Sequence, residues 1–166
     1  MAIIQVPAVQ TGGMTSLASG SIAASSTGFD LQNISSDYNE LWLYITNYSM
    51  SETAHIQCRI NNNTSSDYSH VYNAWSTSMT TAQGSTLIPM ANSVNATQAG
   101  QSAWIRFPNY KNTTGYKHYQ WAATNADNTL WCGNGFNRST SAISRITVIS
   151  SAGTYDSGTY QLWGVK

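Results

Sequence analysis

Hydrophobic residues recur at every second position over much of the chain. In LWLYITN (residues 41–47), Leu41, Leu43 and Ile45 fall on one side, while Trp42 and Tyr44 fall on the other. This spacing predicts a β-strand, because a helix would repeat its apolar positions at three and four. Two further strands, AHIQCRIN (residues 54–61) and SAWIRFP (residues 102–108), are predicted by the same alternation. Their inward residues would be Ile56, Cys58 and Ile60 in the first and Ala103, Ile105 and Phe107 in the second. The same alternation continues in KHYQWAA, TLWCG, ISRITVI and TYQLWGV, and more weakly in LASGSIAAS and YSHVYNAW.

Turn-forming segments separate these strands. They are rich in Gly, Asn, Asp and Ser, which favour turns for distinct steric and hydrogen-bonding reasons: SSTGFD, NNNTSSD, NYKNTTGY, TNADN and SSAGTYDSG. Eight or nine short strands divided in this way predict an all-β, antiparallel domain closed as a sandwich or barrel. We predict one domain over residues 14–166, preceded by a short extended N-terminal arm over residues 1–13, which ends at Gly12-Gly13.

The connections between strands can be predicted at two places. Residues 77–101 show little alternation, which indicates a long excursion across one end of the domain. Near the C-terminus, Ser157-Gly158 is predicted to close a turn, so that residues 159–165 return as a strand opposite residues 143–149. Both sides of this last strand carry large apolar groups, and we therefore expect both of its faces to be covered.

The composition argues against several classes of function. The 166 residues include seven basic and seven acidic side chains, and only 8% are charged. Binding to nucleic acid requires a concentrated basic face, which this chain cannot supply. No apolar run approaches the roughly 18 residues of a membrane span, and MAIIQVPAVQ has no basic region typical of a signal peptide. A neutral polar surface of this kind is common on proteins that face the outside or pack into large assemblies.

Candidate catalytic and metal-binding residues are few. Asp67 could orient His70, but no nucleophile motif accompanies them. Cys58 and Cys132 are predicted to be buried free thiols, with a disulfide possible only if their strands are neighbours. Glycoside hydrolysis would need a carboxylate pair from Asp30, Asp37, Glu40, Glu52, Asp67, Asp127 and Asp156, most of which fall in turn-like segments. We therefore predict no enzyme activity, no metal site and no cofactor.

Several segments, taken in order, resemble a known family. GGMTSLASGSIAASSTGFDLQNI, YNELWLYITNYS, IQCRINNN and AISRITVISSAGTYDSGTYQLWGVK resemble a recurrent module of tailed-bacteriophage virion proteins, found in tail fibres and in small capsid decoration proteins. The resemblance runs from about Gly12 to Lys166, with Tyr155 and Trp163 in place of the commoner aromatics. It implies a jelly-roll-like β-sandwich with a structural or adhesive role, and it implies no catalytic residue.

The alternation also predicts candidate interface residues. Trp42 and Tyr44 share the face opposite the core, and Trp104 and Arg106 occupy the equivalent face of their strand. This stripe could be covered by the excursion, form an oligomer interface or stack sugar rings. Trp163 on the last strand is predicted to contact a neighbouring subunit, preferably in a homotrimer, because the resemblance points to assemblies with threefold symmetry. Within the arm, Ile3, Ile4 and Val6 form an apolar strip that could add a strand to a partner's sheet.

These observations favour a non-enzymatic structural protein on the surface of a tailed-phage virion, assembled in the host cytoplasm. A chain of this size has room for the module and an arm but for no long shaft, so we expect a capsid decoration or cement protein that binds phage structural proteins. The alternative is a short tail-fibre or receptor-binding protein that recognises host-surface carbohydrate. A carbohydrate-active enzyme is disfavoured by the shortage of carboxylates.

Overall fold

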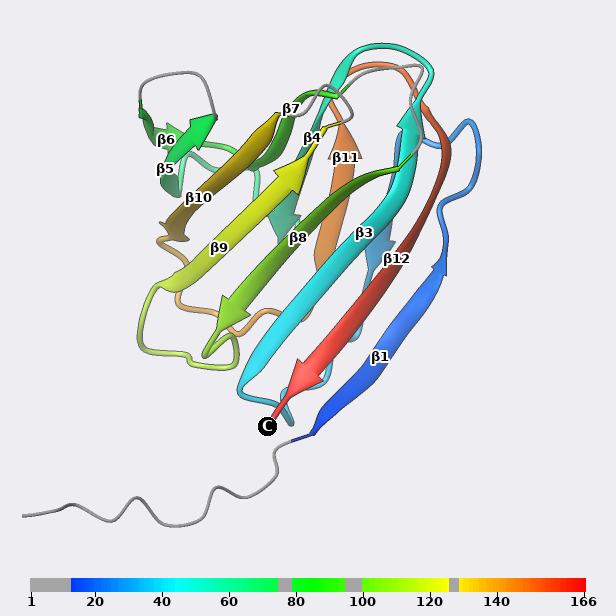
Figure 1. Cartoon of the computed structure of the whole chain (residues 1–166). Helices are drawn as coiled ribbons and strands as arrows, with labels where there is room; N and C mark the ends of the chain where they lie inside the picture. Colours follow the sequence, from blue (N-terminus) through cyan, green and yellow to red (C-terminus); the bar gives the residue numbers. More distant parts are fainter. Residues whose placement is uncertain (1–12, 75–78, 95–99, 126–128) are drawn as a thin grey trace, which may run out of the picture.

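The fold is a sandwich of two antiparallel β-sheets. The computed structural model describes residues 13–74, 79–94, 100–125 and 129–166. The larger sheet holds, in spatial order, β1 (Met14–Ser21), β12 (Tyr155–Val165), β3 (Glu40–Met50), β8 (Gln101–Pro108), β9 (Lys117–Thr124), β10 (Leu130–Asn137), β5 (Tyr68–Ala74) and β6 (Thr80–Ser85). The smaller sheet holds β2 (Gly28–Leu31), β11 (Ile146–Ser150), β4 (Ala54–Ile60) and β7 (Ile88–Val94). Figure 1 shows the larger sheet in front and the smaller one behind it.

The predicted all-β, antiparallel architecture is confirmed. Every strand pair that the described residues form runs antiparallel. The two sheets, of eight and four strands, establish a β-sandwich. The more specific jelly-roll connectivity stays a prediction. No helix in the described ranges is long and apolar enough to cross a membrane.

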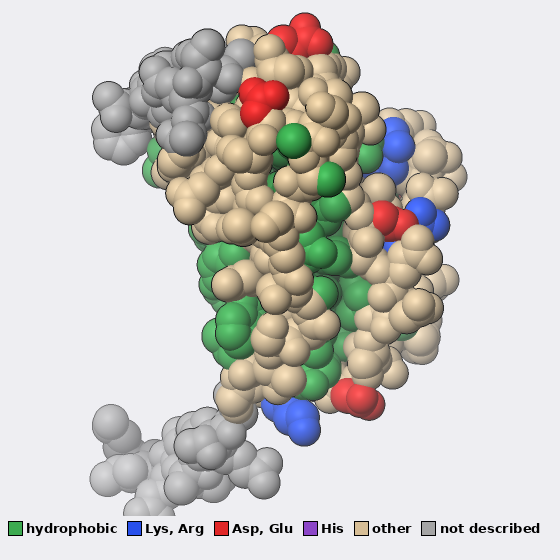
Figure 2. Space-filling view, turned by 90° about the vertical axis from the view of Figure 1, so that its right-hand side faces the viewer, with side chains coloured by type: hydrophobic (Ala, Val, Ile, Leu, Met, Phe, Trp, Pro, Cys, Tyr) green, Lys and Arg blue, Asp and Glu red, His purple; other side chains and the backbone are tan. Residues whose placement is uncertain are grey.

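The core forms where the alternation placed it. Leu41, Leu43 and Ile45 of β3 are fully buried, as are Ile105 and Phe107 of β8. They pack against the inward residues of the smaller sheet, which include Ile56, Cys58 and Val148. Figure 2 looks at the molecule from the side of β1 and shows a band of hydrophobic side chains between the two layers.

The predicted partner of the last strand is wrong. Strand β12 lies between β1 and β3 in the larger sheet, whereas β11 belongs to the smaller sheet and pairs with β2 and β4. Ser157 and Gly158 close no turn, because they lie inside β12, where its pairing with β3 shifts register on both sides of Ser157. Gly158 has a φ of 145°, which suits this irregularity because glycine tolerates a positive φ.

The excursion predicted over residues 77–101 contains two strands. β6 is the outer strand of the larger sheet, and β7 is the outer strand of the smaller one. The sequence TTAQGS of β6 shows no apolar alternation because both of its faces are largely exposed. The predicted N-terminal arm, including Ile3, Ile4 and Val6, lies outside the described residues apart from Gly13.

A buried lysine holds two loops to the end of β9. Lys117 is 1% exposed, and its Nζ donates hydrogen bonds to the carbonyl oxygens of Asn112, Gly115 and Thr140. Burial lowers the pKa of Lys117 below its ordinary value. Three main-chain acceptors thus replace the water that an ammonium group would otherwise bind.

Candidate functional site

The outer face of the larger sheet brings together the aromatic residues that the sequence singled out. Trp163 of β12 lies opposite Trp42 of β3, which lies opposite Arg106 of β8. One pair further along, Tyr44 lies opposite Trp104. We call this cluster of five residues the aromatic patch: Trp42, Tyr44, Trp104, Arg106 and Trp163.

Four members of the aromatic patch, namely Trp42, Tyr44, Trp104 and Arg106, pack on one another. The Trp42 ring lies 5.5 Å from the Trp104 ring and 5.9 Å from the Tyr44 ring, measured between centroids, with interplanar angles of 27° and 15°. The guanidinium carbon of Arg106 lies 5.5 Å from the centre of the Trp42 ring, a cation–π contact. Such offset stacks hold side chains in fixed positions, so the patch is an ordered surface.

Polar contacts fix the orientation of Arg106. Its Nε donates a 2.7 Å hydrogen bond to Oε1 of Gln120, and its Nη1 lies 3.6 Å from Oε1 of Glu40. The Arg106 side chain is 35% exposed, so this ion pair contributes little stability and chiefly orients the group. Partial burial and the Glu40 carboxylate also raise the pKa of Tyr44.

The described residues leave the aromatic patch partly open. All five of its side chains are half-buried, whereas the residues that alternate with them on β3 and β8 are buried. Of the excursion, β6 lies beyond β5 at the edge of the larger sheet and β7 lies in the smaller sheet, so neither strand covers the stripe. The expected second cover of β12 is likewise not supplied by the described residues, because Gln161 is exposed and Trp163 and Val165 remain half-exposed. Concentrated apolar surface of this kind marks an interaction site.

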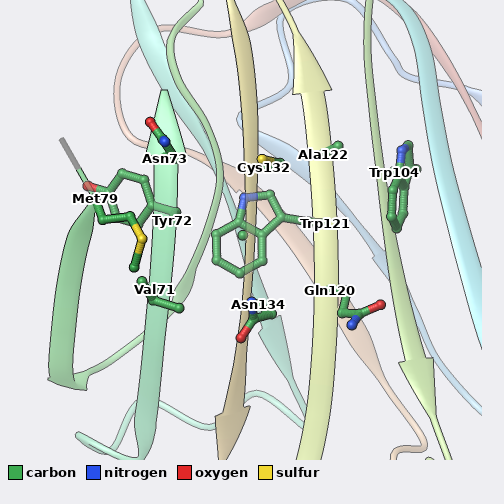
Figure 3. Close-up of a pocket in the computed structure, with 11 residues that line it drawn as sticks. Val71, Tyr72, Asn73, Met79, Trp104, Gln120, Trp121, Ala122, Cys132 and Asn134 are labelled. Carbon is green, nitrogen blue, oxygen red and sulfur yellow. The ribbon is translucent and has the colours of Figure 1, made fainter. Parts of the chain in front are cut away.

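Beside the patch lies a hollow of about 380 Å³ that the sequence did not reveal. We call it the outer hollow. Side chains from neighbouring strands form two rows across the hollow, as Figure 3 shows. One row holds Asn73, Cys132, Ala122 and Trp104, and the other holds Val71, Asn134 and Gln120. Gln120 alternates along β9 with the buried residues Tyr119 and Trp121, but the order of the strands could not be read from the sequence.

Both cysteines are free thiols, and only one of them is buried. Cys58 lies fully buried in β4, where burial raises the pKa of its thiol. Cys132 of β10 is exposed on the outer face, so the prediction that it is buried is wrong. The alternation of TLWCG is real, but this strand turns Gly133 inward and Cys132 outward.

His70 and Asp67, the pair weighed from the sequence, each contact other groups. His70 points into the core beside Trp121, their ring centroids 6.0 Å apart, and burial lowers the pKa of His70. Asp67 accepts a hydrogen bond from the side chain of Asn63 in the preceding loop. Within the described ranges, no three His, Cys, Asp or Glu residues come close enough to hold a metal ion.

The Asn-rich loops form turns. Asn61 has a φ of 50° and Asn109 a φ of 51°, and the side-chain oxygen of Asn112 accepts hydrogen bonds from the main-chain nitrogens of Thr114 and Gly115. These asparagines therefore serve the backbone.

Comparison with protein-family models, curated proteins and solved structures found no match. The site must accordingly be interpreted from its own chemistry. Aromatic rings, one arginine and neutral amides on an open sheet face can bind a partner by stacking and hydrogen bonding.

Proposed function

We propose that this chain is a non-enzymatic structural protein on the surface of a tailed-phage virion, where it decorates the capsid and stabilises the shell. The observation that carries the proposal is the aromatic patch, an ordered stack of tryptophan, tyrosine and arginine on a face that the described residues do not cover. The family resemblance of the sequence supplies the virion context. A decoration protein works by burying surface against neighbouring subunits, so that more contacts must break before the shell opens.

The composition of the patch supports such a contact. Tryptophan, tyrosine and arginine are enriched among the residues that contribute most to protein interfaces. Their stacking fixes the side chains before binding, which reduces the conformational entropy lost in the complex. The low charge of the chain also allows close packing without buried unpaired ions.

The test is reconstitution on particles that lack this protein. Purified wild-type protein should bind such particles and sediment with them. Trp42→Ala should bind at least tenfold more weakly, because Trp42 is the residue on which Tyr44, Trp104 and Arg106 all pack. The matched control is Tyr116→Ala, which removes a 54%-exposed aromatic outside the patch and should bind normally. Full occupancy by a folded Trp42→Ala variant would contradict the proposal.

Self-association and the arm can be tested with the same material. We propose a homo-oligomer, with a trimer preferred, in which Trp163 contacts a neighbouring copy. Trp163→Ala should then give a folded protein of lower mass in solution, whereas an unchanged mass would contradict this contact. A chain without residues 1–13 should stay folded and lose attachment to particles.

The alternative function is that of a short tail-fibre or receptor-binding protein. The observation that favours it is the outer hollow, whose neutral amides are suited to a polar uncharged ligand. Imaging of the virion separates the two, because one places the chain on the shell and the other on the tail.

A further inference from the structure

The Trp104 ring takes part in two surfaces at once. One face packs against Trp42 in the aromatic patch, with 5.5 Å between ring centroids. In Figure 3 the ring is seen edge-on, with its other face turned toward Ala122 and the outer hollow. The stack on Trp42 holds the ring upright, so Trp104 forms a fixed aromatic wall of the hollow.

Neutral amides line the hollow next to this wall. Gln120 and Asn134 lie opposite each other on β9 and β10, and Asn73 lies opposite Cys132 on β5. Oε1 of Gln120 accepts the hydrogen bond from Arg106, and Figure 3 shows the amide nitrogen of Gln120 on the side of Asn134. These amides offer donors and acceptors within reach of the aromatic wall.

Charge is missing from the lining of the hollow. Among the described residues that border it, none is Asp, Glu, Lys, Arg or His. Two of the lining residues, Ala122 and Gly133, have little or no side chain. Gly133 itself is required there, because a Cβ at this position would lie 2.5 Å from Cη2 of Trp121 and 2.7 Å from Cβ of Tyr72.

We propose that the outer hollow binds a neutral sugar ring stacked on the free face of Trp104. The C–H groups on one face of a pyranose ring are weakly positive and complement the negative face of an aromatic ring. The hydroxyl groups at its edge both donate and accept hydrogen bonds, as do Gln120 and Asn134. An aliphatic ligand would cover the amide nitrogen of Gln120 and the amide of Asn134 without bonding them, and an anionic one would find no cation among the lining residues.

The sugar site does not depend on the proposed decoration function. The aromatic patch is centred on β3 and has members on β12 and β8, whereas the hollow extends from β8 over β9, β10 and β5, and Trp104 belongs to both. A protein attached through the β12 and β3 side of the patch can therefore expose the hollow. Binding of sugar by the isolated protein is measured without particles, so failure of one proposal leaves the other unaffected.

The experiment is a nuclear magnetic resonance titration of the full chain with methyl glycosides of glucose, galactose, mannose, rhamnose and N-acetylglucosamine. At least one should shift the indole N–H signal of Trp104 and the side-chain amide signals of Gln120 and Asn134 in a saturable way. Trp104→Phe, which keeps a ring, identifies the indole signal and should retain weak binding. Trp104→Ala should weaken binding at least tenfold.

Controls exclude stacking at other exposed rings. Tyr116→Ala should bind as the wild-type protein does, and circular dichroism should show each variant folded. The absence of saturable shifts with every glycoside up to tens of millimolar would overturn the proposal. Binding that survives Trp104→Ala, or that is tighter for glucuronic acid than for the neutral sugars, would overturn it as well.

Discussion

Replacing Lys117 by methionine removes a buried ammonium group while keeping a side chain of similar length. The Nζ of Lys117 donates to the carbonyl oxygens of Asn112, Gly115 and Thr140 over 2.5, 2.9 and 3.1 Å. Hydrogen bonds that involve a charged group contribute about 1.5–3 kcal/mol each to stability. Against this gain stands the cost of burying the ion, which is several kcal/mol and which methionine does not incur.

The balance of these effects sets the expected loss. Desolvation lowers the pKa of Lys117, and methionine avoids that cost, but it leaves the three carbonyl groups of Asn112, Gly115 and Thr140 without their donor. Each buried acceptor left without a hydrogen bond costs about 1–3 kcal/mol. We expect Lys117→Met to lower the free energy of unfolding by about 2–4 kcal/mol. In a domain of this size each kcal/mol corresponds to a fall in Tm of about 2–4 °C.

The assay is urea unfolding followed by tryptophan fluorescence at neutral pH. Lys111→Met is the matched control, because Lys111 is an exposed lysine six positions earlier and its loss should change stability by less than about 0.5 kcal/mol. Equal midpoints for the two variants would refute the reasoning, since the three hydrogen bonds would then contribute no net stability.

Three further predictions concern the core and the thiols. Burial raises the pKa of Tyr48, Tyr68, Tyr119 and Tyr155. The stabilisation from these raised pKa values is complete below about pH 10, the pKa of tyrosine in the unfolded chain. Above that pH, each of these tyrosines lowers the free energy of unfolding by about 1.4 kcal/mol per pH unit. A free energy of unfolding, measured in urea, that stays constant up to pH ~11 would contradict this. Gly133→Ala should destabilise by about 1–3 kcal/mol through its clash with Trp121, whereas Gly115→Ala, with no atom closer than 3.8 Å, should be nearly neutral by the same urea assay. A thiol-reactive chromophore should label Cys132 alone in the folded protein and both cysteines in urea; rapid labelling of Cys58 in the folded protein would show that the core opens.

Local pattern predicted which residues face the core, and it did so because the period of two belongs to each strand separately. Leu41, Leu43 and Ile45 are buried, and Trp42 and Tyr44 lie on the outer face, as the alternation required. The same reasoning placed Trp104 and Arg106 on an outward face. Their contact with Trp42 depends on the pairing of β3 with β8, two strands that lie far apart in the sequence. Alternation within a single strand does not predict such a pairing.

Long-range pairing also explains what the sequence could not predict. The partners of β12 are β1 and β3, and nothing in TYQLWGV distinguishes these from β11. The outer hollow draws its lining from β5, β8, β9 and β10, so it could not be assembled before their order was known. The burial of Lys117 runs against the strong preference of lysine for the surface and depends on three carbonyl groups from two loops.

Electron cryo-microscopy of capsid particles reconstituted with this chain tests the proposed decoration function most directly. We predict that the two-sheet sandwich lies on the capsid shell, with the β12 and β3 side of its outer face packed against a neighbouring protein and Trp42 buried in that contact. A shell without this sandwich, or a sandwich on the shell whose aromatic patch faces solvent, would contradict it.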